Sequence, residues 1–149
     1  NKCMALQKNR ALVKSKAQGW FLFFDVDAFK SINDTYGHLV GDEVLCGFAK
    51  RLEKALSPYG VVGRLGGDEF AAILHKPITE NALAALLDDL YKNLADILPQ
   101  QKVTCSIGVC SFTYPQEIRK LMYATDKALY KAKERGRACY VFGEAESKE

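Results

Sequence analysis

The fold of this chain is decided around Arg64-Leu65-Gly66-Gly67-Asp68-Glu69-Phe70, a stretch that lies between two apolar runs, 60–63 and 70–74. Gly-Gly between strand-like runs predicts a tight hairpin, because glycine accepts the positive φ that such turns need. Asp68 and Glu69 are then expected at the hairpin tip, where a backbone without side chains admits a bulky ligand. Carboxylates at that place suit a hard cation with phosphate bound to it. Taken alone, the pattern is also typical of a surface hairpin with solvated acids.

Length and composition indicate one ordinary globular domain. The chain has 149 residues, of which 48% are hydrophobic and 26% charged. Its net charge of +3 is too small to indicate a nucleic-acid or anionic-membrane partner, and no apolar run approaches the ~20 residues that span a bilayer. Five cysteines without a CxxC pair favour neither a disulfide scaffold nor a zinc site. We therefore expect a single domain over 1–149, in a reducing cytoplasm, with no nucleic-acid partner and no membrane contact of its own.

Hydrophobic periodicity predicts the order of helices and strands along the chain. A basic helix over 1–17 precedes a buried strand over 20–26, a helix over 40–56 and the hairpin strands 60–64 and 69–75. Thr79 is expected to cap a helix that continues to Ile97. A strand over 103–112, a helix from 118 to near Gly136 and a closing strand over 138–142 follow. This order predicts a layered α+β domain whose central sheet is mostly antiparallel, with five strands, and is flanked by helices.

Two acids, Asp25 and Asp27, end the first buried strand. A buried carboxylate needs a partner, and a metal ion is the natural one for Asp25. Asp27 has an alternative role as the N-cap of the following helix. If the first strand lies beside the hairpin, Asp25 and Asp68 meet at one edge. Two carboxylates and a backbone carbonyl leave positions for water and phosphate oxygens, as Mg²⁺ prefers at nucleotide sites. The chemistry then expected is phosphoryl or nucleotidyl transfer.

Two further groups of polar residues admit both a functional and an ordinary interpretation. Asn33 and Asp42 could together recognise a guanine edge, or each could simply cap a helix. The basic stretch near the end of the chain is typical of a solvated helix face. Within it, Lys133 and Arg137 are spaced i, i+4 and could point together at a phosphate tail. The other members of the stretch are Lys127, Lys131 and Arg135.

Taken together, these segments resemble the GGDEF domain of diguanylate cyclases. The matching segments occur in order and cover nearly the whole chain, which makes the resemblance far more specific than one short motif. They are Phe24-Asp25-Val26-Asp27-Ala28-Phe29-Lys30-Ser31-Ile32-Asn33-Asp34-Thr35-Tyr36-Gly37-His38, Gly41-Asp42-Glu43-Val44-Leu45, Arg64-Leu65-Gly66-Gly67-Asp68-Glu69-Phe70, Ser106-Ile107-Gly108-Val109, Asp126-Lys127-Ala128-Leu129-Tyr130-Lys131-Ala132-Lys133 and Gly136-Arg137.

The resemblance implies a fold like the palm of nucleotide cyclases and polymerases. It also implies condensation of two GTP molecules to cyclic di-GMP and two pyrophosphates, with one GTP held by each domain of a facing homodimer. The expected metal is Mg²⁺, with Mn²⁺ as a substitute. Its implied ligands are Asp25, the carbonyl of Val26 and Asp68, which is also the implied proton acceptor. Glu69 is grouped with Asp68 as a catalytic acid and metal ligand, and Lys30 is the implied transition-state stabiliser.

Substrate contacts are implied by the same resemblance. Asn33 and Asp42 would bind guanine, and His38 would contact a further part of the substrate. The phosphates would be bound by the backbone at Phe29 and Lys30 and by the side chains of Lys133 and Arg137.

The sequence departs from the family pattern at three places. The Arg-x-x-Asp motif of the usual product-inhibition site is replaced by Ser57-Pro58-Tyr59-Gly60, so that site is expected to be absent. The usual Asn after Gly-Arg is Ala138, which we expect to loosen a loop. The opening Asp-x-Leu-Thr-x-Leu segment is missing, and we expect the chain to be a fragment of a longer sensory protein with an upstream sensor domain, anchored in some cases in the inner membrane.

Two alternative functions remain open at this stage. One is a catalytically silent regulatory domain that binds GTP or cyclic di-GMP. Such relatives usually have degraded signature residues, whereas both acids of the signature survive here. The other is an unrelated palm-type nucleotidyltransferase, which would require the long set of matches to be accidental.

Overall fold

A computed structural model describes residues 18–113 and 116–144 of the chain. The helix expected over 1–17 lies outside the described residues. The described elements, in chain order, are β1 (Gln18–Val26), α3 (Phe29–Tyr36), α4 (His38–Leu56), β2 (Gly60–Gly66), β3 (Glu69–Leu74), α5 (Glu80–Leu94), β4 (Cys105–Thr113), α6 (Ile118–Glu134) and β5 (Tyr140–Glu144).

The strands form one five-stranded sheet in the order β2-β3-β1-β4-β5. β1 is central and pairs antiparallel with both β3 and β4, and β2 pairs antiparallel with β3. Only the pair of β4 with β5 is parallel among the described strands. The prediction of an α+β domain with a mostly antiparallel five-stranded sheet is therefore confirmed.

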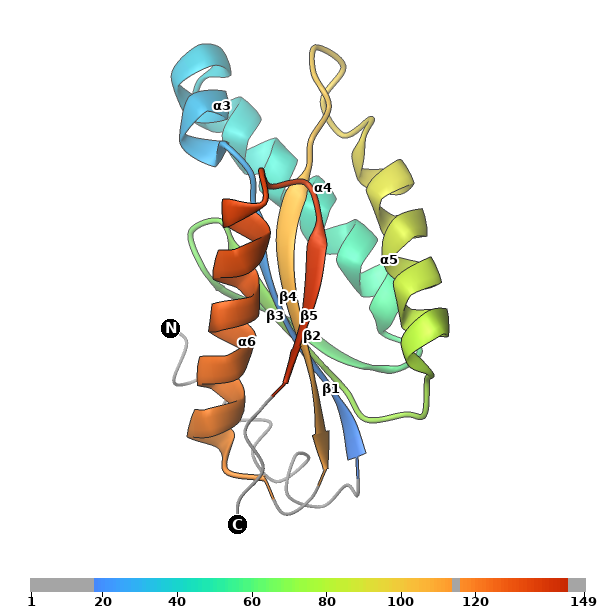
Figure 1. Ribbon diagram of the computed structural model, residues 1–149. Helices are drawn as coiled ribbons and strands as arrows, with labels where there is room; N and C mark the ends of the chain where they lie inside the picture. The colour runs from blue at the N-terminus through green and yellow to red at the C-terminus, as the bar shows by residue number, and fades with distance from the viewer. Residues whose placement is uncertain (1–17, 114–115, 145–149) are drawn as a thin grey trace.

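Helices cover both faces of this sheet (Figure 1). Because side chains alternate along a strand, Leu22 and Phe24 of β1 point to one face and Phe21 and Phe23 to the other. The Leu22 side packs against α4 and α5 in the larger core, and the Phe21 side packs against α6 in a smaller one. All four of these side chains are buried, as the apolar run predicted.

Close packing of α6 on the sheet depends on Gly108 in β4. A Cβ at Gly108 would lie 2.3 Å from the carbonyl oxygen of Thr125 and 2.4 Å from the amide nitrogen of Leu129, both in the α6 backbone. No side chain fits in that space, so only glycine allows the helix axis to come so near the strand. This contact fixes the height of α6 above the sheet and with it the position of Lys133 near the helix end.

The structure corrects the predicted elements at two places. A short helix, α3, occupies 29–36, a segment for which hydrophobic periodicity predicted no helix; α3 buries only Ile32 and lacks a side-chain cap. The helix capped by Thr79 ends at Leu94 and does not continue to Ile97. The Thr79 cap itself is confirmed, because its Oγ1 accepts a hydrogen bond from the Ala82 amide at 3.1 Å.

No helix in the described ranges is long and apolar enough to cross a membrane.

Candidate active site

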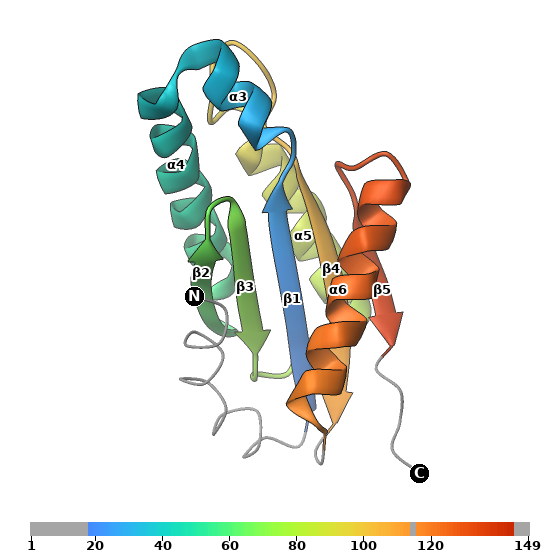
Figure 2. The same cartoon turned by 90° about the vertical axis from the view of Figure 1, so that its left-hand side faces the viewer.

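Three segments that are distant in sequence meet at one edge of the sheet (Figure 2). They are the end of β1, the turn between β2 and β3, and the end of α6 with the loop that follows it. The amide of Val26 donates a hydrogen bond to the carbonyl oxygen of Asp68 at 3.1 Å, which joins the end of β1 to the hairpin turn. The predicted meeting of the first strand with the signature hairpin is therefore present in the fold.

Asp25 lies on the face of the sheet that α6 covers. Its side chain is 13% exposed and forms an ion pair with the ammonium group of Lys133. Glu69 is directly opposite Asp25 in the pairing of β1 with β3, so both side chains project from the same face. The partner that a buried carboxylate requires is thus Lys133 in this structure, where the sequence indicated a metal ion.

Asp68 is half-buried in the hairpin turn, so its carboxyl is less accessible than the solvated acid of an ordinary surface hairpin. Burial is the largest cause that raises the pKa of its carboxyl, and contact with the Asp25 carboxylate is the next; together they raise that pKa from 3.8 to about 6. A carboxyl group raises the pKa of another in this way only when the two lie close together. The predicted juxtaposition of Asp25 and Asp68 is therefore supported by geometry and electrostatics.

The hairpin turn is shaped by glycine and held by an arginine. Gly67 has φ of 55°, a left-handed conformation that a residue with a side chain rarely adopts. The Nε of Arg64 donates a hydrogen bond to the carbonyl oxygen of Gly67 at 2.9 Å. Arg64 therefore stabilises the turn, a role that the sequence motif did not predict.

The candidate guanine-binding residues lie where α3 meets α4. The Asn33 side chain crosses directly over Gly41, since a Cβ at Gly41 would fall 1.8 Å from the Asn33 Oδ1. Asp42 is the next residue along α4 and is exposed, and it lines a hollow of about 470 Å³ between α4 and the hairpin strands. Neither residue is an N-cap, because α3 begins after Ala28 and α4 after Gly37. The helix-cap alternative is therefore wrong for both.

The predicted phosphate contacts, and the further substrate contact His38, lie on several elements, and sequence spacing placed only some of them correctly. Lys30 in α3 and His38 at the start of α4 are exposed, and Phe29 is partly buried against the larger core. Arg137 does not share a helix face with Lys133, because α6 ends at Glu134. Arg137 instead lies in the following loop with φ of 66° and an exposed side chain. The i, i+4 argument for this pair is therefore wrong, although both residues remain near the active edge.

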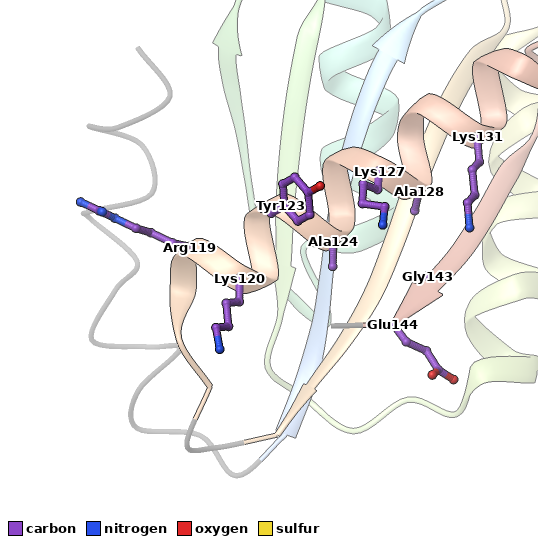
Figure 3. Close-up of a pocket in the computed structure, with 9 residues that line it drawn as sticks. All are labelled: Arg119, Lys120, Tyr123, Ala124, Lys127, Ala128, Lys131, Gly143 and Glu144. Atoms are coloured by element: carbon purple, nitrogen blue, oxygen red, sulfur yellow. The ribbon is translucent and has the colours of Figure 1, made fainter. Parts of the chain in front are cut away.

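The other basic residues of α6 lie along a separate groove. Lys127 and Lys131 line a hollow of about 300 Å³ between the outer side of α6 and the end of β5 (Figure 3). Lys127 also lies 5.5 Å from the centre of the Tyr123 ring. Both lysines are exposed, so the interpretation of most of the basic stretch as a solvated helix face is confirmed.

Sequence reasoning missed the role of Asp27. Its carboxylate does not cap α3; it accepts hydrogen bonds from the hydroxyls of Thr104 and Ser106, both at 2.7 Å, and from the amide of Ala138 at 2.9 Å. The amide of Asp27 also donates to the carbonyl oxygen of Thr104 at 2.9 Å. We call this set of contacts the Asp27 clamp. Its partners lie far along the chain, so local sequence contained no signal for it.

Comparison with known proteins agrees with this geometry. A family model described as "Diguanylate cyclase, GGDEF domain" matches residues 3–139. The chain belongs to the GGDEF family. Among curated members, the probable diguanylate cyclase DgcC of Escherichia coli K12 is 41% identical over 122 residues, which cover 78% of this chain and 32% of that protein. Diguanylate cyclase DgcM of the same strain is 40% identical over 120 residues, covering 78% of this chain and 28% of the relative.

Solved GGDEF structures share the whole fold. The GGDEF domain of DgcB from Caulobacter crescentus, in complex with c-di-GMP, has a TM-score of 0.80 at 25% identity and covers 98% of this chain and 90% of its own. Diguanylate cyclase SiaD of Pseudomonas aeruginosa, in complex with its activator SiaC, has a TM-score of 0.83 at 30% identity, covering 95% and 58%. The chain spans only about a third of the curated relatives named above.

GGDEF diguanylate cyclases are nucleotidyl cyclases that generally need a divalent metal. The question for this chain is whether its side chains at the active edge suit such an ion. The described residues contain no group of three or more acidic, histidine or cysteine side chains arranged around one point. They do bring the Asp25 and Asp68 carboxyls together, and repulsion from Asp25 contributes to the raised pKa of Asp68. A hard cation would relieve that repulsion. Two carboxylates, with other positions filled by water and phosphate oxygens, match a nucleotide-bound metal better than a closed protein cage.

Proposed function

We propose that this domain is a diguanylate cyclase, which condenses two GTP molecules into cyclic di-GMP and two pyrophosphates. The observation that carries the proposal is the meeting of Asp25 and Asp68 at the edge where β1, the Gly-Gly turn and α6 converge. Family membership supports the same reaction. Two domains would face each other, each holding one GTP, because each nucleotide supplies the attacking group for the other.

The reaction consists of two equivalent phosphoryl substitutions. In each, the 3′-oxygen of one GTP attacks the α-phosphorus of the other. A new phosphorus–oxygen bond forms, the bond to the β,γ-pyrophosphate breaks, and the 3′-hydroxyl loses its proton. The second substitution closes the ring, so that two GTP yield one cyclic dinucleotide, two pyrophosphates and two protons. Catalysis therefore requires a proton acceptor, positioning of the nucleotide and stabilisation of negative charge.

Asp68 is the proposed proton acceptor. Without a metal ion, burial and the Asp25 carboxylate raise the pKa of Asp68 to about 6, above that of an ordinary aspartate, which favours its carboxylate as an acceptor of a proton. Glu69 stands opposite Asp25 and would add a second acid beside it. A divalent ion held by Asp25, the Val26 carbonyl and Asp68, with help from Glu69, would supply charge neutralisation and activation of the attacking hydroxyl. We expect Mg²⁺ in that role and Mn²⁺ as a substitute.

The cations around the edge would hold the triphosphate. Lys133 projects from α6 beside Asp25, Arg137 stands exposed in the next loop, and Lys30 is an exposed residue in the first turn of α3. Together these three side chains would partly neutralise the charge of a triphosphate bound at the end of β1. Lys30 is proposed to stabilise the transition state. The backbone at Phe29 would contact phosphate oxygens.

Guanine recognition is proposed for Asn33 and Asp42, with His38 as a further substrate contact. A carboxylate can accept from the ring N–H and the exocyclic amine of guanine, and an amide can both donate and accept. The position of Asn33 over Gly41 supports the pairing, because it puts the amide one residue from Asp42. A site that matches one base rejects a base that leaves its polar groups unpaired. Asp42→Ala should therefore remove most of the preference for GTP over ATP, and equal affinity of the wild type for both nucleotides would contradict this role.

The usual product-inhibition site is expected to be missing. Ser57 follows α4 and Gly60 begins β2, at the places where the family motif has Arg and Asp. A Cβ at Gly60 would lie 1.9 Å from the carbonyl oxygen of Ile73, so no acidic side chain fits there. Calorimetric titration of cyclic di-GMP into the nucleotide-free domain should show no submicromolar site. Tight product binding that a non-hydrolysable GTP analogue fails to displace would contradict this expectation.

The decisive experiment is turnover by the domain forced into dimers through a fused coiled coil. With GTP and Mg²⁺, chromatography should detect cyclic di-GMP and two pyrophosphates for each product molecule. The unfused domain should be much slower because it must find its partner by diffusion. A fused domain that binds GTP tightly and makes no cyclic di-GMP would support the silent regulatory alternative. In the full-length protein, we expect an upstream sensor domain to control this pairing of cytoplasmic domains.

A further inference from the structure

The Asp27 clamp joins three segments at the active edge. Both oxygens of one carboxylate are used: Oδ1 accepts from the Ser106 hydroxyl, and Oδ2 accepts from the Thr104 hydroxyl and the Ala138 amide. Thr104 immediately precedes β4 and Ser106 is its second residue, whereas Ala138 lies in the loop between α6 and β5. Asp27 itself follows β1. One side chain therefore ties the central strand to its neighbour and to a loop beyond the helix.

The loop held by this clamp has an unusual backbone. Arg137 and Ala138 are consecutive residues with side chains, and both have left-handed φ values, 66° and 51°. Such a conformation costs roughly 1–2 kcal/mol for each residue that is not glycine. Strained backbone of this kind persists where the surroundings fix it, and it concentrates at functional sites. Two hydrogen bonds hold it here: the Arg137 amide donates to the carbonyl oxygen of Ala132 at 3.0 Å, and the Ala138 amide donates to the Asp27 carboxylate at 2.9 Å.

We propose that Asp27 is a positioning residue for the triphosphate: it holds the 136–138 loop in its left-handed form and so directs Arg137 toward the phosphate tail of GTP. The inference rests on the proposed function, because it takes Arg137 as a phosphate contact. We assign Asp27 no contact with metal or substrate, because its carboxylate already accepts hydrogen bonds from three protein donors. Its effect on binding should therefore appear only for ligands that carry a β,γ-diphosphate.

The test compares two nucleotides by calorimetry, a non-hydrolysable GTP analogue and GMP, which lacks the tail. Asp27→Asn removes the negative charge that holds the Ala138 amide, and charge-assisted hydrogen bonds are about twice as strong as neutral ones. We expect about tenfold weaker binding of the analogue and less than twofold change for GMP. Thr104→Val should show a smaller loss of the same kind, and Thr104→Ser, which keeps the hydroxyl, should restore wild-type affinity. Asp89→Asn, an exposed acid on α5, is the matched control.

A double variant distinguishes positioning from general damage. If Asp27 acts through Arg137, then Asp27→Asn should cost little further analogue affinity in an Arg137→Ala background. Thermal melting checks that each variant is folded, and Thr104→Val and Ser106→Ala replace Asp27→Asn if that variant does not fold. Additive losses in the double variant, or equal losses for GMP and the analogue, would overturn the inference.

Failure of the inference and failure of the proposed function give different results. A wild-type dimer that makes cyclic di-GMP, together with an Asp27→Asn variant whose analogue affinity is unchanged, would overturn the inference alone. A wild-type dimer that makes no cyclic di-GMP, together with an Asp27→Asn variant that loses affinity for the analogue and not for GMP, would support the clamp and contradict the proposed function alone.

Discussion

At the end of the sheet where β1 meets the hairpin turn, acids face each other and the backbone bends into left-handed conformations. At the opposite end, the contacts are ordinary: the Trp20 indole donates to the carbonyl oxygen of Ile78 at 2.9 Å, and Thr79 caps α5. Every residue with positive φ in the described ranges belongs to segments at the first end. They are Ala28, Gly37, Gly66, Gly67, Gly136, Arg137 and Ala138. The difference shows where the fold accepts strain, and it coincides with the proposed GTP site.

The largest expected effect is at the strained end. Asp68→Ala removes a proposed metal ligand and proton acceptor, so kcat of the forced dimer should fall by at least about a thousandfold, or roughly 4 kcal/mol in the barrier. The variant should remain folded, because the loss of Asp68 also removes a repulsive neighbour of Asp25. Steady-state kinetics and circular dichroism measure both properties. Near-normal turnover by folded Asp68→Ala would break the link between strain and catalysis, and Asp89→Asn serves as the neutral control.

The second prediction concerns the conventional packing of the sheet. Gly108→Ala puts a methyl group within 2.3 Å of the α6 backbone, so the helix must shift away from β4. Overpacking of this kind costs about 3 kcal/mol in the free energy of unfolding. Gly63→Ala is the matched control, because a Cβ at Gly63 in edge strand β2 meets nothing within 4 Å. Chemical denaturation should show a clearly lower free energy of unfolding for Gly108→Ala than for Gly63→Ala. Equal stabilities of the two variants would show that α6 is not held by this close approach.

The third prediction uses the pH dependence of the metal-free protein. The pKa of Asp68 is raised from 3.8 to about 6 in the folded state, so the folded state binds a proton more tightly than the unfolded state. The stabilising effect of that proton is present below about pH 4 and is lost as pH rises through about pH 6. In EDTA, Asp68→Asn should therefore become more stable relative to wild type between pH 4 and pH 7. Melting curves that shift in parallel for both proteins would contradict the assigned repulsion.

The smallest expected effect sharpens the comparison at Ala138. Asn tolerates a left-handed φ better than Ala, because its short polar side chain can hydrogen-bond locally. Ala138→Asn should therefore raise the free energy of unfolding by about 0.5–1 kcal/mol, whereas β-branched Ala138→Val should lower it. Chemical denaturation of both variants and of wild type measures these changes in the free energy of unfolding. If both variants have the same stability, the backbone at residue 138 does not hold the φ of 51° that the structure gives it.

Much of the fold followed from patterns that are local in sequence. The apolar run that contains Phe21 to Phe24, the Gly-Gly hairpin and the Thr79 cap each predicted an element that the structure contains. α3 was missed because a helix of 8 residues with one buried side chain has too short an apolar pattern to recognise. The stop at Leu94 was missed because Ile97 continues the apolar spacing after the chain has turned.

The candidate site was predictable only in part, because its contacts join distant segments. The meeting of Asp25 with Asp68 followed from a strand lying beside a hairpin. Lys133 was expected to contact phosphate, and in the structure its ammonium group pairs with the carboxylate of Asp25, 108 residues away in sequence. The Asp27 clamp joins residues separated by 77 to 111 positions. No spacing rule reaches so far, and only the assembled sheet brings those groups together.

Metal binding tests the central claim most directly: the strained end of the sheet is a site for a divalent ion and a nucleotide. Mn²⁺ binding can be followed by electron paramagnetic resonance with a non-hydrolysable GTP analogue present, for wild type, Asp68→Asn and Asp89→Asn. We expect wild type and Asp89→Asn to bind Mn²⁺ with equal affinity and Asp68→Asn to bind it at least about tenfold more weakly. Equal Mn²⁺ affinity in all three proteins would contradict a metal site that includes Asp68.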